Sequence, residues 1–342
     1  MNMQFIKKLP IPKEVKAMFP LTPDLVKLKQ KRDDEIKAVF SGKLDRFILL
    51  IGPCSADRED AVMDYMERLA GVQEKVSSQL LIIPRLYTGK PRSSGFGYMG
   101  LVHQPDPNGE ENLYEGIISV RKLHINVLNN TGFSCADEML YPENYRYLSD
   151  LLSYAAVGAR SCENQQHRLT ASGLNIPVGF KNPTGGNLDV MMQSINAATM
   201  PHHFIYRRWE VKSEGNQYAH GVLRGYSDHE GKNHPNYGYD CLMATATLFQ
   251  KYNIENPAII VDVNHANSDK DPNKQIPISL DVLQSRKRDF GLNKMIKGLM
   301  IESYLEDGCQ PVDGTCFGKS ITDPCLGWKK TEALIYSIAD KI

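Results

Sequence analysis

The sequence lacks three features that would place it outside the ordinary globular proteins. Its seven cysteines are an odd number and none has CxxC spacing, which argues against a secreted disulfide framework or a zinc knuckle. Lysine plus arginine equals aspartate plus glutamate at 40 each, so no global field draws the chain to nucleic acid or an anionic membrane. The longest apolar run near the N-terminus, residues 47–51, is too short to span a bilayer. We expect a soluble, cytoplasmic protein with reduced thiols and no nucleic-acid or membrane partner.

What the sequence does contain is a repeated alternation of two patterns. With 42% hydrophobic residues, the chain can bury one large core. From residue 47, short apolar runs alternate with stretches of helical periodicity, as in βα units of a parallel sheet. The eight runs are residues 47–52, 80–84, 132–136, 155–159, 177–180, 203–206, 258–263 and 297–301. We predict an α/β protein with a (β/α)8 TIM barrel over residues 46–342.

The polar residues that follow the runs favour a closed barrel over an open, doubly wound sheet. Each run ends near a side chain that binds metals or anions: Cys54, Arg85, Glu138, Arg160, Lys181, Arg207 or Arg208, His265 and Glu302. Barrel enzymes build their sites from the C-terminal ends of many strands, whereas an open sheet uses mainly one switch point. The pattern therefore predicts an active site at the mouth of a barrel.

The first 45 residues differ from the rest of the chain. They contain no strand pattern, and four prolines precede a lysine-rich helical stretch from Asp24 to Phe40. We interpret residues 1–45 as an N-terminal extension. Two roles are possible for it, a solvated leader or a subunit-contact arm.

Four dispersed residues form a candidate metal site. Cys54 follows the first run, His265 the seventh and Glu302 the eighth, and Asp323 comes shortly after. A thiolate, an imidazole and two carboxylates mix soft and hard donors, which suits a divalent first-row metal better than calcium or magnesium. Taken alone, Cys54 is more often an inert buried cysteine. For each of His265, Glu302 and Asp323 alone, a core histidine or an exposed or salt-bridged carboxylate is at least as common as a metal ligand.

Six cations near the run ends form a second candidate site. Arginine binds phosphate or carboxylate through two parallel hydrogen bonds, and lysine supplies a mobile charge that can also transfer a proton. A single cation is usually only a solvated surface charge, but six at strand ends indicate an anionic, phosphorylated substrate. They are Arg85, Lys90, Arg92, Arg160, Lys181 and Arg224. Lys181 also has an alternative role as a Schiff-base lysine, although the neighbouring arginines favour anion binding.

Eight short motifs together resemble one enzyme family. They are Ile51-Gly-Pro-Cys-Ser55, Lys90-Pro-Arg-Ser93, Gly158-Ala-Arg-Ser161, Pro177-Val-Gly-Phe-Lys-Asn182, Leu223-Arg-Gly225, His265-Ala-Asn-Ser268, Ile301-Glu-Ser303 and Gly318-Lys-Ser-Ile-Thr-Asp323. The set resembles the type I 3-deoxy-D-arabino-heptulosonate 7-phosphate (DAHP) synthases, also called phospho-2-dehydro-3-deoxyheptonate aldolases, from about residue 5 to the end. The resemblance implies condensation of phosphoenolpyruvate with D-erythrose 4-phosphate and water, the first step of the shikimate pathway.

The resemblance also implies a role for each candidate. It implies one divalent ion (Mn, Fe, Co or Zn) and a homodimer or homotetramer, with Lys90, Cys54, His265 and Glu138 as catalytic residues. The implied metal ligands are Cys54, His265, Glu302 and Asp323. The implied phosphoenolpyruvate ligands are Arg85, Arg160, Lys181 and Arg224, and the implied erythrose 4-phosphate loop is Lys90, Pro91, Arg92 and Ser93.

Two other activities and one regulatory difference stay open at this point. The related synthase that uses arabinose 5-phosphate normally carries asparagine next to the loop arginine, so Lys90-Pro-Arg-Ser93 favours the four-carbon aldose. A noncatalytic metal- or phosphate-binding regulator on the same scaffold is the other alternative. Asn175 and Tyr206 replace serines typical of phenylalanine-sensitive relatives. Because the bulk of Tyr206 would fill the inhibitor cavity, we predict weak or absent inhibition by phenylalanine.

Overall fold

A ring of parallel strands forms the centre of the protein, whose computed structural model describes residues 2–92, 95 and 97–342. The strands are β1 (Phe47–Gly52), β2 (Leu80–Pro84), β3 (Ala136–Glu138), β4 (Tyr154–Val157), β5 (Val178–Lys181), β8 (Ala219–Leu223), β11 (Ile259–Asp262) and β12 (Ile296–Glu302). They pair in the order β2-β1-β12-β11-β8-β5-β4-β3. A parallel bridge between Arg85 and Ala136 joins the two ends of this sheet. The ring is therefore closed, and the predicted (β/α)8 barrel is confirmed.

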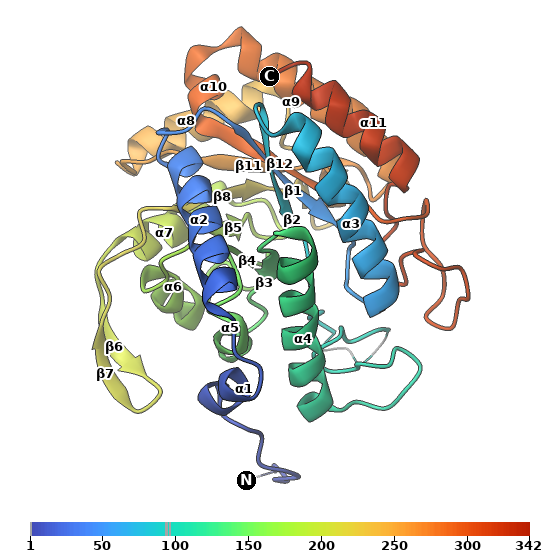
Figure 1. Ribbon diagram of the computed structural model, residues 1–342. Helices are drawn as coiled ribbons and strands as arrows, with labels where there is room; N and C mark the ends of the chain where they lie inside the picture. The colour runs from blue at the N-terminus through green and yellow to red at the C-terminus, as the bar shows by residue number, and fades with distance from the viewer. Residues whose placement is uncertain (1, 93–94, 96) are drawn as a thin grey trace.

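Helices surround the strands and connect them in sequence (Figure 1). They are α3 (Glu59–Val76), α4 (Leu113–Thr131), α5 (Pro142–Leu148), α6 (Gln165–Ser172), α7 (Leu188–Thr199), α8 (Tyr239–Lys251), α9 (Gln275–Arg288), α10 (Phe290–Met295) and α11 (Trp328–Ala339). Short 3-10 turns, η1 (His265–Asn267) and η2 (Pro272–Lys274), follow β11. Among the described residues, none of the helices is both long and apolar enough to cross a membrane.

The core has two layers because the strands are buried on both faces. Strand β1 is buried at all six positions, as expected for a parallel strand covered by helices. In the outer layer, one face of α3 packs on the strands through Val62, Met66 and Leu69, the face that the helical periodicity predicts. The inner layer is a separate apolar cluster inside the ring.

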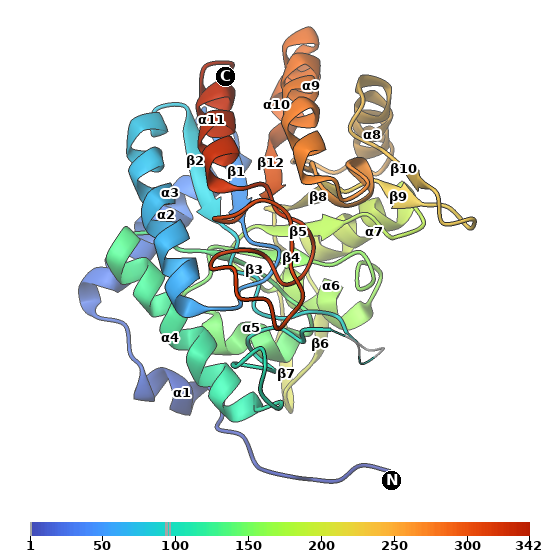
Figure 2. The ribbon, with the colours of Figure 1, turned by 90° about the vertical axis from the view of Figure 1, so that its right-hand side faces the viewer.

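Helix α2 (Pro23–Phe40) packs against this inner layer. Thr22 caps the helix by accepting a hydrogen bond from the Leu25 amide at 3.3 Å. At its other end, Ile36 and Phe40 are fully buried within the inner cluster. The predicted helix at 24–40 is therefore present. Before it, α1 (Pro12–Met18) packs against α5 with Val15 fully buried, and the first residues extend away from the barrel in both views (Figures 1 and 2).

The prediction of the sixth barrel strand was wrong. Residues 203–206 form β6 (His203–Tyr206), which pairs antiparallel with β7 (Trp209–Lys212) in a hairpin that projects from the barrel (Figure 1). The barrel strand is β8, which begins with Ala-His-Gly and so gives a weaker apolar run than His-Phe-Ile-Tyr. A second small sheet pairs β9 (Tyr226–Ser227) with β10 (Asn233–His234).

The third strand begins later than predicted. Gly132, with φ +72°, ends α4 in the left-handed conformation and donates its amide hydrogen to the Leu128 carbonyl. The chain then enters the barrel through buried residues that are not paired as a strand, and β3 itself covers only 136–138. The predicted run at 132–136 therefore consists mostly of a helix C-terminus and an entry segment.

Candidate active site

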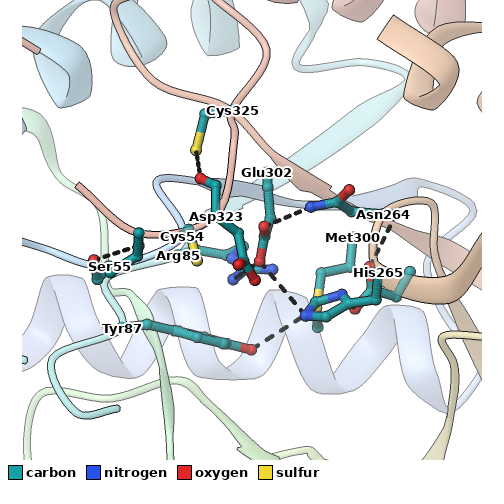
Figure 3. Close-up of polar contacts among 12 residues, drawn as sticks. Cys54, Ser55, Arg85, Tyr87, Asn264, His265, Met300, Glu302, Asp323 and Cys325 are labelled. Atoms are coloured by element: carbon teal, nitrogen blue, oxygen red, sulfur yellow. Dashed lines mark hydrogen bonds and ion pairs between the residues drawn. The ribbon is translucent and has the colours of Figure 1, made fainter. Parts of the chain in front are cut away.

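Three of the four proposed metal ligands meet at one end of the barrel. Gly52 pairs with Glu302 where β1 and β12 end side by side, and the chain reaches Cys54 two residues later. The connection from β12 to α11 folds back so that Asp323 joins them. One ligand atom from each of Cys54, Glu302 and Asp323 lies within 4.8 Å of the other two, and the side chains converge in Figure 3.

His265, the fourth proposed ligand, is next to this group but not within the same 4.8 Å. Its Nε2 lies 3.8 Å from Oε1 of Glu302, and its Nδ1 lies 2.9 Å from Oδ2 of Asp262. The backbone of His265 has φ +53°, a left-handed conformation that costs about 1–3 kcal/mol in a residue other than glycine. The fold thus holds this imidazole in a strained position facing Glu302.

The charges around these ligands match a bound cation. Cys54 and Glu302 are buried. Burial, and secondarily the nearby Glu302 carboxylate, raise the pKa of the Cys54 thiol. Without a compensating charge, a thiolate and two carboxylates this close would repel one another. Nζ of Lys90 lies 3.0 Å from Sγ of Cys54 and so places a cation beside the sulfur. The donor set and its crowding both fit a divalent first-row metal.

Glu302 is held by neighbours on both of its oxygens. Arg85 lies 2.8 Å from Oε1, and Asn264 donates a hydrogen bond to Oε2 at 2.5 Å (Figure 3). Although burial opposes ionisation, Arg85 and His265 hold the pKa of Glu302 below its usual range. The carboxylate is therefore kept charged and oriented before any ligand arrives.

Beside the metal ligands, five of the six predicted cations line a cavity of about 450 Å³. Its polar lining includes Lys90, Arg92, Glu138, Arg160, Lys181, Arg224, His265, Lys270 and Asp323. Pro91 lines it as well, and Ser93 lies outside the described residues. Arg207 and Arg208, which the sequence placed at a barrel strand end, lie instead between β6 and β7 with positive φ. Arg224 occupies the position after the true sixth strand.

Arg85 is buried next to this cavity with unused hydrogen-bonding capacity. Its guanidinium lies 4.1 Å from the ring centroid of Tyr87, and one of its nitrogens contacts Glu302. Its Nε and Nη1 are buried and have no hydrogen-bond partner among the described residues. Because unpaired buried donors are costly, these two groups indicate a missing acceptor such as an anionic ligand.

Glu138 has room in the cavity only because its neighbour across the sheet end is glycine. A Cβ atom on Gly158 would lie 2.1 Å from Oε1 of Glu138. The position after β4 therefore requires a residue without a side chain if this carboxylate is to keep its place.

Two residues that the sequence analysis missed hold the predicted ones in place. Asp262, fully buried, lies 3.2 Å from Nζ of Lys181 as well as beside His265. Burial would raise the pKa of Asp262, but His265 and Lys181 hold it well below its usual range. Lys270 lies 3.0 Å from Asp323. Alternating polar residues in Val261-Asp-Val-Asn-His265 were the available signal for Asp262, whereas Lys270 lies in a loop and gave none.

Known proteins with similar sequences and structures point to one family. A family model described as "DAHP synthetase I family" matches residues 24–335. The Phe-sensitive phospho-2-dehydro-3-deoxyheptonate aldolase of Escherichia coli K12 is 36% identical, over 98% of this chain and 95% of that protein. The Trp-sensitive enzyme of the same strain is 34% identical, over 98% and 96%. The solved structure of the Francisella tularensis SCHU S4 aldolase has 31% identity and a TM-score of 0.92, over 100% and 98%.

Proposed function

Because the chain belongs to the DAHP synthetase I family and so condenses phosphoenolpyruvate with erythrose 4-phosphate, we propose that this reaction takes place in the cavity beside Cys54 and Glu302. The activity is that of a 3-deoxy-7-phosphoheptulonate synthase, a transferase (EC 2.5.1.54). The observation that carries the assignment of the site is the meeting of a thiol and two carboxylates with a cation-lined cavity at one end of the barrel.

The family's divalent metal would be held by Cys54, Glu302 and Asp323, with His265 as the fourth ligand. When bound, the ion supplies Lewis acidity toward the aldehyde oxygen of erythrose 4-phosphate. Mn, Fe, Co and Zn all fit this donor set. The chain supports the ligands from behind, since Asp262 orients the His265 ring and Arg85 and Asn264 fix Glu302.

The cations would hold two anionic substrates against their mutual repulsion. Arg160, Lys181 and Arg224 line the cavity and would bind the phosphate and carboxylate of phosphoenolpyruvate. The unpaired donors of Arg85 would complete this set. Lys90, Pro91, Arg92 and Ser93 would bind erythrose 4-phosphate. Such positioning replaces an encounter in solution by a reaction within one complex.

Lys90 and Glu138 would handle the protons. C3 of phosphoenolpyruvate bonds to the aldehyde carbon, and the carbonyl oxygen takes the electron pair and then a proton from the Lys90 ammonium. Water then adds to C2, and phosphate leaves from the same carbon. Glu138, a carboxylate among cations in the cavity lining, would orient that water and accept its proton.

The reaction and its aldose are tested by one paired assay. Consumption of phosphoenolpyruvate is followed by its ultraviolet absorbance with erythrose 4-phosphate or arabinose 5-phosphate, each with and without a chelator. We expect consumption with the four-carbon aldose only, and loss of that activity on chelation. Preference for arabinose 5-phosphate would instead favour the octulosonate synthase, and no turnover with either would favour a noncatalytic regulator.

We also propose a homodimer or homotetramer in which residues 1–45 act as a subunit-contact arm on the catalytic barrel of 46–342. Support comes from apolar side chains left in solvent on two projecting segments. In the arm, Phe5 is 87% exposed and Ile6 89% exposed. In the hairpin, Ile205 and Trp209 are likewise exposed. Seven free cysteines fit a reducing compartment, and we propose the cytoplasm.

A further inference from the structure

A second cationic cavity lies at the opposite end of the barrel from the proposed active site. It measures about 340 Å³ and is formed where β1 and β12 begin, between the end of α2 and helices α9 and α10. Because parallel strands all point the same way, this end is remote from the ends that carry Cys54 and Glu302. Figure 1 shows α10 and the turn that follows α2 near each other at one end of the ribbon. The cavity belongs to no part of the proposed reaction.

Its lining combines four cations with a single carboxylate. The cations are Arg46, Arg286, Lys294 and Lys297, and the carboxylate is Asp45. Among the described residues, neither Arg286 nor Lys297 has a carboxylate within 4.0 Å, and the closest acidic contact of Arg46 is to Glu35 at 3.9 Å. Protein interiors and clefts rarely collect like charges without a compensating partner.

Arg286 is the most constrained of the four. Its guanidinium lies 4.6 Å from the ring centroid of Phe47, and it donates one hydrogen bond to the Asn293 carbonyl at 3.2 Å. Its Nε is buried without a hydrogen-bond partner among the described residues. The side chain is thus held in one orientation with part of its donor capacity unused. Pre-organisation of this kind lowers the entropy lost when an anion binds.

The electrostatics of the cavity agree with this geometry. Burial lowers the pKa of Arg286 to about 10, although Asp45 opposes the change. Burial and the neighbouring Arg286 and Lys294 lower the pKa of Lys297. Positive charge is therefore held here at a cost that the chain's own carboxylates do not offset, and a bound anion would remove that cost.

We propose that this cavity is a binding site for a small dianion, of the phosphate-monoester or dicarboxylate class, separate from the active site. Four cations against one carboxylate leave a net charge of three positive in the lining, enough for a ligand that carries two negative charges. A volume of about 340 Å³ lies at the lower end of the range for small-molecule sites. A bound anion would connect β12, α9, α10 and the residues just before β1.

The test uses full-length protein with its metal and saturating phosphoenolpyruvate, so that part of the active-site cavity is already occupied. Inorganic phosphate and, separately, succinate are titrated by calorimetry into the wild type, Arg286→Met and Lys287→Met. Lys287 is exposed, lies outside the cavity and is next to Arg286 on α9. The Lys287→Met substitution therefore removes one positive charge from the same helix without changing the cavity. Lys297→Gln serves as a second cavity variant if Arg286→Met is unstable.

We expect the wild type to bind at least one of the two anions at a site whose affinity falls about tenfold or more in Arg286→Met and stays within about twofold in Lys287→Met. The anion that binds identifies the ligand class. Unchanged affinity in the cavity variants, equal loss in Lys287→Met, or no binding of either anion to the wild type would each overturn the proposal. Turnover is measured in parallel in a buffer without added phosphate or succinate. This measurement distinguishes failure of the proposed anion site from failure of the active-site assignment.

Discussion

Nζ of Lys90 lies 3.0 Å from Sγ of Cys54, so the loop proposed to bind the aldose phosphate reaches directly to the proposed metal ligands. A proton donor at this place would be within reach of the aldehyde oxygen of a substrate bound beside these ligands. The same contact would allow one lysine to serve both substrate binding and proton transfer. It also makes Lys90 the first residue to test.

Lys90→Met should abolish turnover while leaving phosphoenolpyruvate binding close to that of the wild type. Removal of a general acid costs about 10²–10⁴-fold in rate, whereas the ligands proposed for phosphoenolpyruvate are other residues. The measurements are kcat and, separately, the dissociation constant of phosphoenolpyruvate by calorimetry. Lys329→Met, on the exposed side of α11, is the matched control. Near-normal kcat in Lys90→Met would refute the proposed role.

Cys54→Ser should lose bound metal and activity together. The thiol is one of three ligand atoms that lie within 4.8 Å of one another, and an alcohol is a much poorer ligand than a thiolate for a borderline metal. Metal content per chain is measured alongside kcat. Cys316→Ser, at an exposed position, should keep both. In the wild type, chelation should remove activity and added Mn²⁺ should restore it, and full activity of metal-free protein would contradict the site.

Gly158→Ala should lower kcat with little change in stability. The new methyl group would lie 2.1 Å from Oε1 of Glu138, and that carboxylate, at the end of a flexible side chain, is the group that can move. We expect a thermal midpoint close to that of the wild type and a loss of activity similar to that of Glu138→Gln. Gly71→Ala, at an open position on α3, should be neutral in rate and slightly stabilising. Normal kcat in Gly158→Ala would show that the position of Glu138 is not critical.

Much of the fold and site could be predicted because strong local patterns coincided with barrel geometry. Seven of the eight apolar runs overlap barrel strands, since parallel strands are buried on both faces and therefore continuously apolar. Strand β8 was not predicted because His220 and Gly221 interrupt its apolar run. The imidazole of His220 is satisfied inside the barrel by the Tyr154 hydroxyl at 2.8 Å, a tertiary contact that no local pattern shows.

The residues that the sequence proposed for the site lie together at one end of the barrel, whereas the contacts that support them were not predicted. Cys54 and Glu302 follow apolar runs, where chemistry is expected in a barrel. Asp262 is the last residue of β11 and looks like part of the strand, and its role depends on Lys181 arriving from β5. Supporting contacts of this kind depend on three-dimensional packing and cannot be read from spacing.

Inhibition by phenylalanine should be weak or absent. Tyr206 lies half-buried in the β6 strand of the projecting hairpin, with its ring centroid 6.2 Å from that of Phe204 and the Arg207 guanidinium 5.1 Å away. The resemblance implies serine at this position in sensitive relatives, and we expect the aromatic side chain of Tyr206 to occupy the space of the inhibitor. Steady-state rates with and without phenylalanine measure this, and Tyr206→Ser should gain sensitivity. Strong inhibition of the wild type would overturn the prediction.

Acid should destabilise the protein through two buried histidines, whose pKa values burial lowers to about 3 for His124 and about 4 for His220. Both are neutral in the folded state, whereas in the unfolded chain they bind a proton below about pH 6.5. The unfolded state therefore takes up more protons as the pH falls from about 6.5 toward 4, and stability is lost over that window. Each histidine contributes up to about 1.4 kcal/mol per pH unit.

His124→Leu should flatten this dependence because it removes one of the two groups. Nε2 of His124 has no hydrogen-bond partner among the described residues, so an apolar replacement loses no paired contact and should leave stability at pH 7.5 similar or slightly higher. At pH 5, about 1.5 pH units below the pKa of an unfolded histidine, the free energy of unfolding of the variant should exceed that of the wild type by about 2 kcal/mol. Thermal midpoints at fixed protein concentration across this pH range provide the measurement. His229→Leu, at a surface position 90% exposed, is the control and should show the wild-type dependence of the thermal midpoint on pH. If His124→Leu also shows the wild-type dependence, the His124 imidazole is not held neutral in the folded protein.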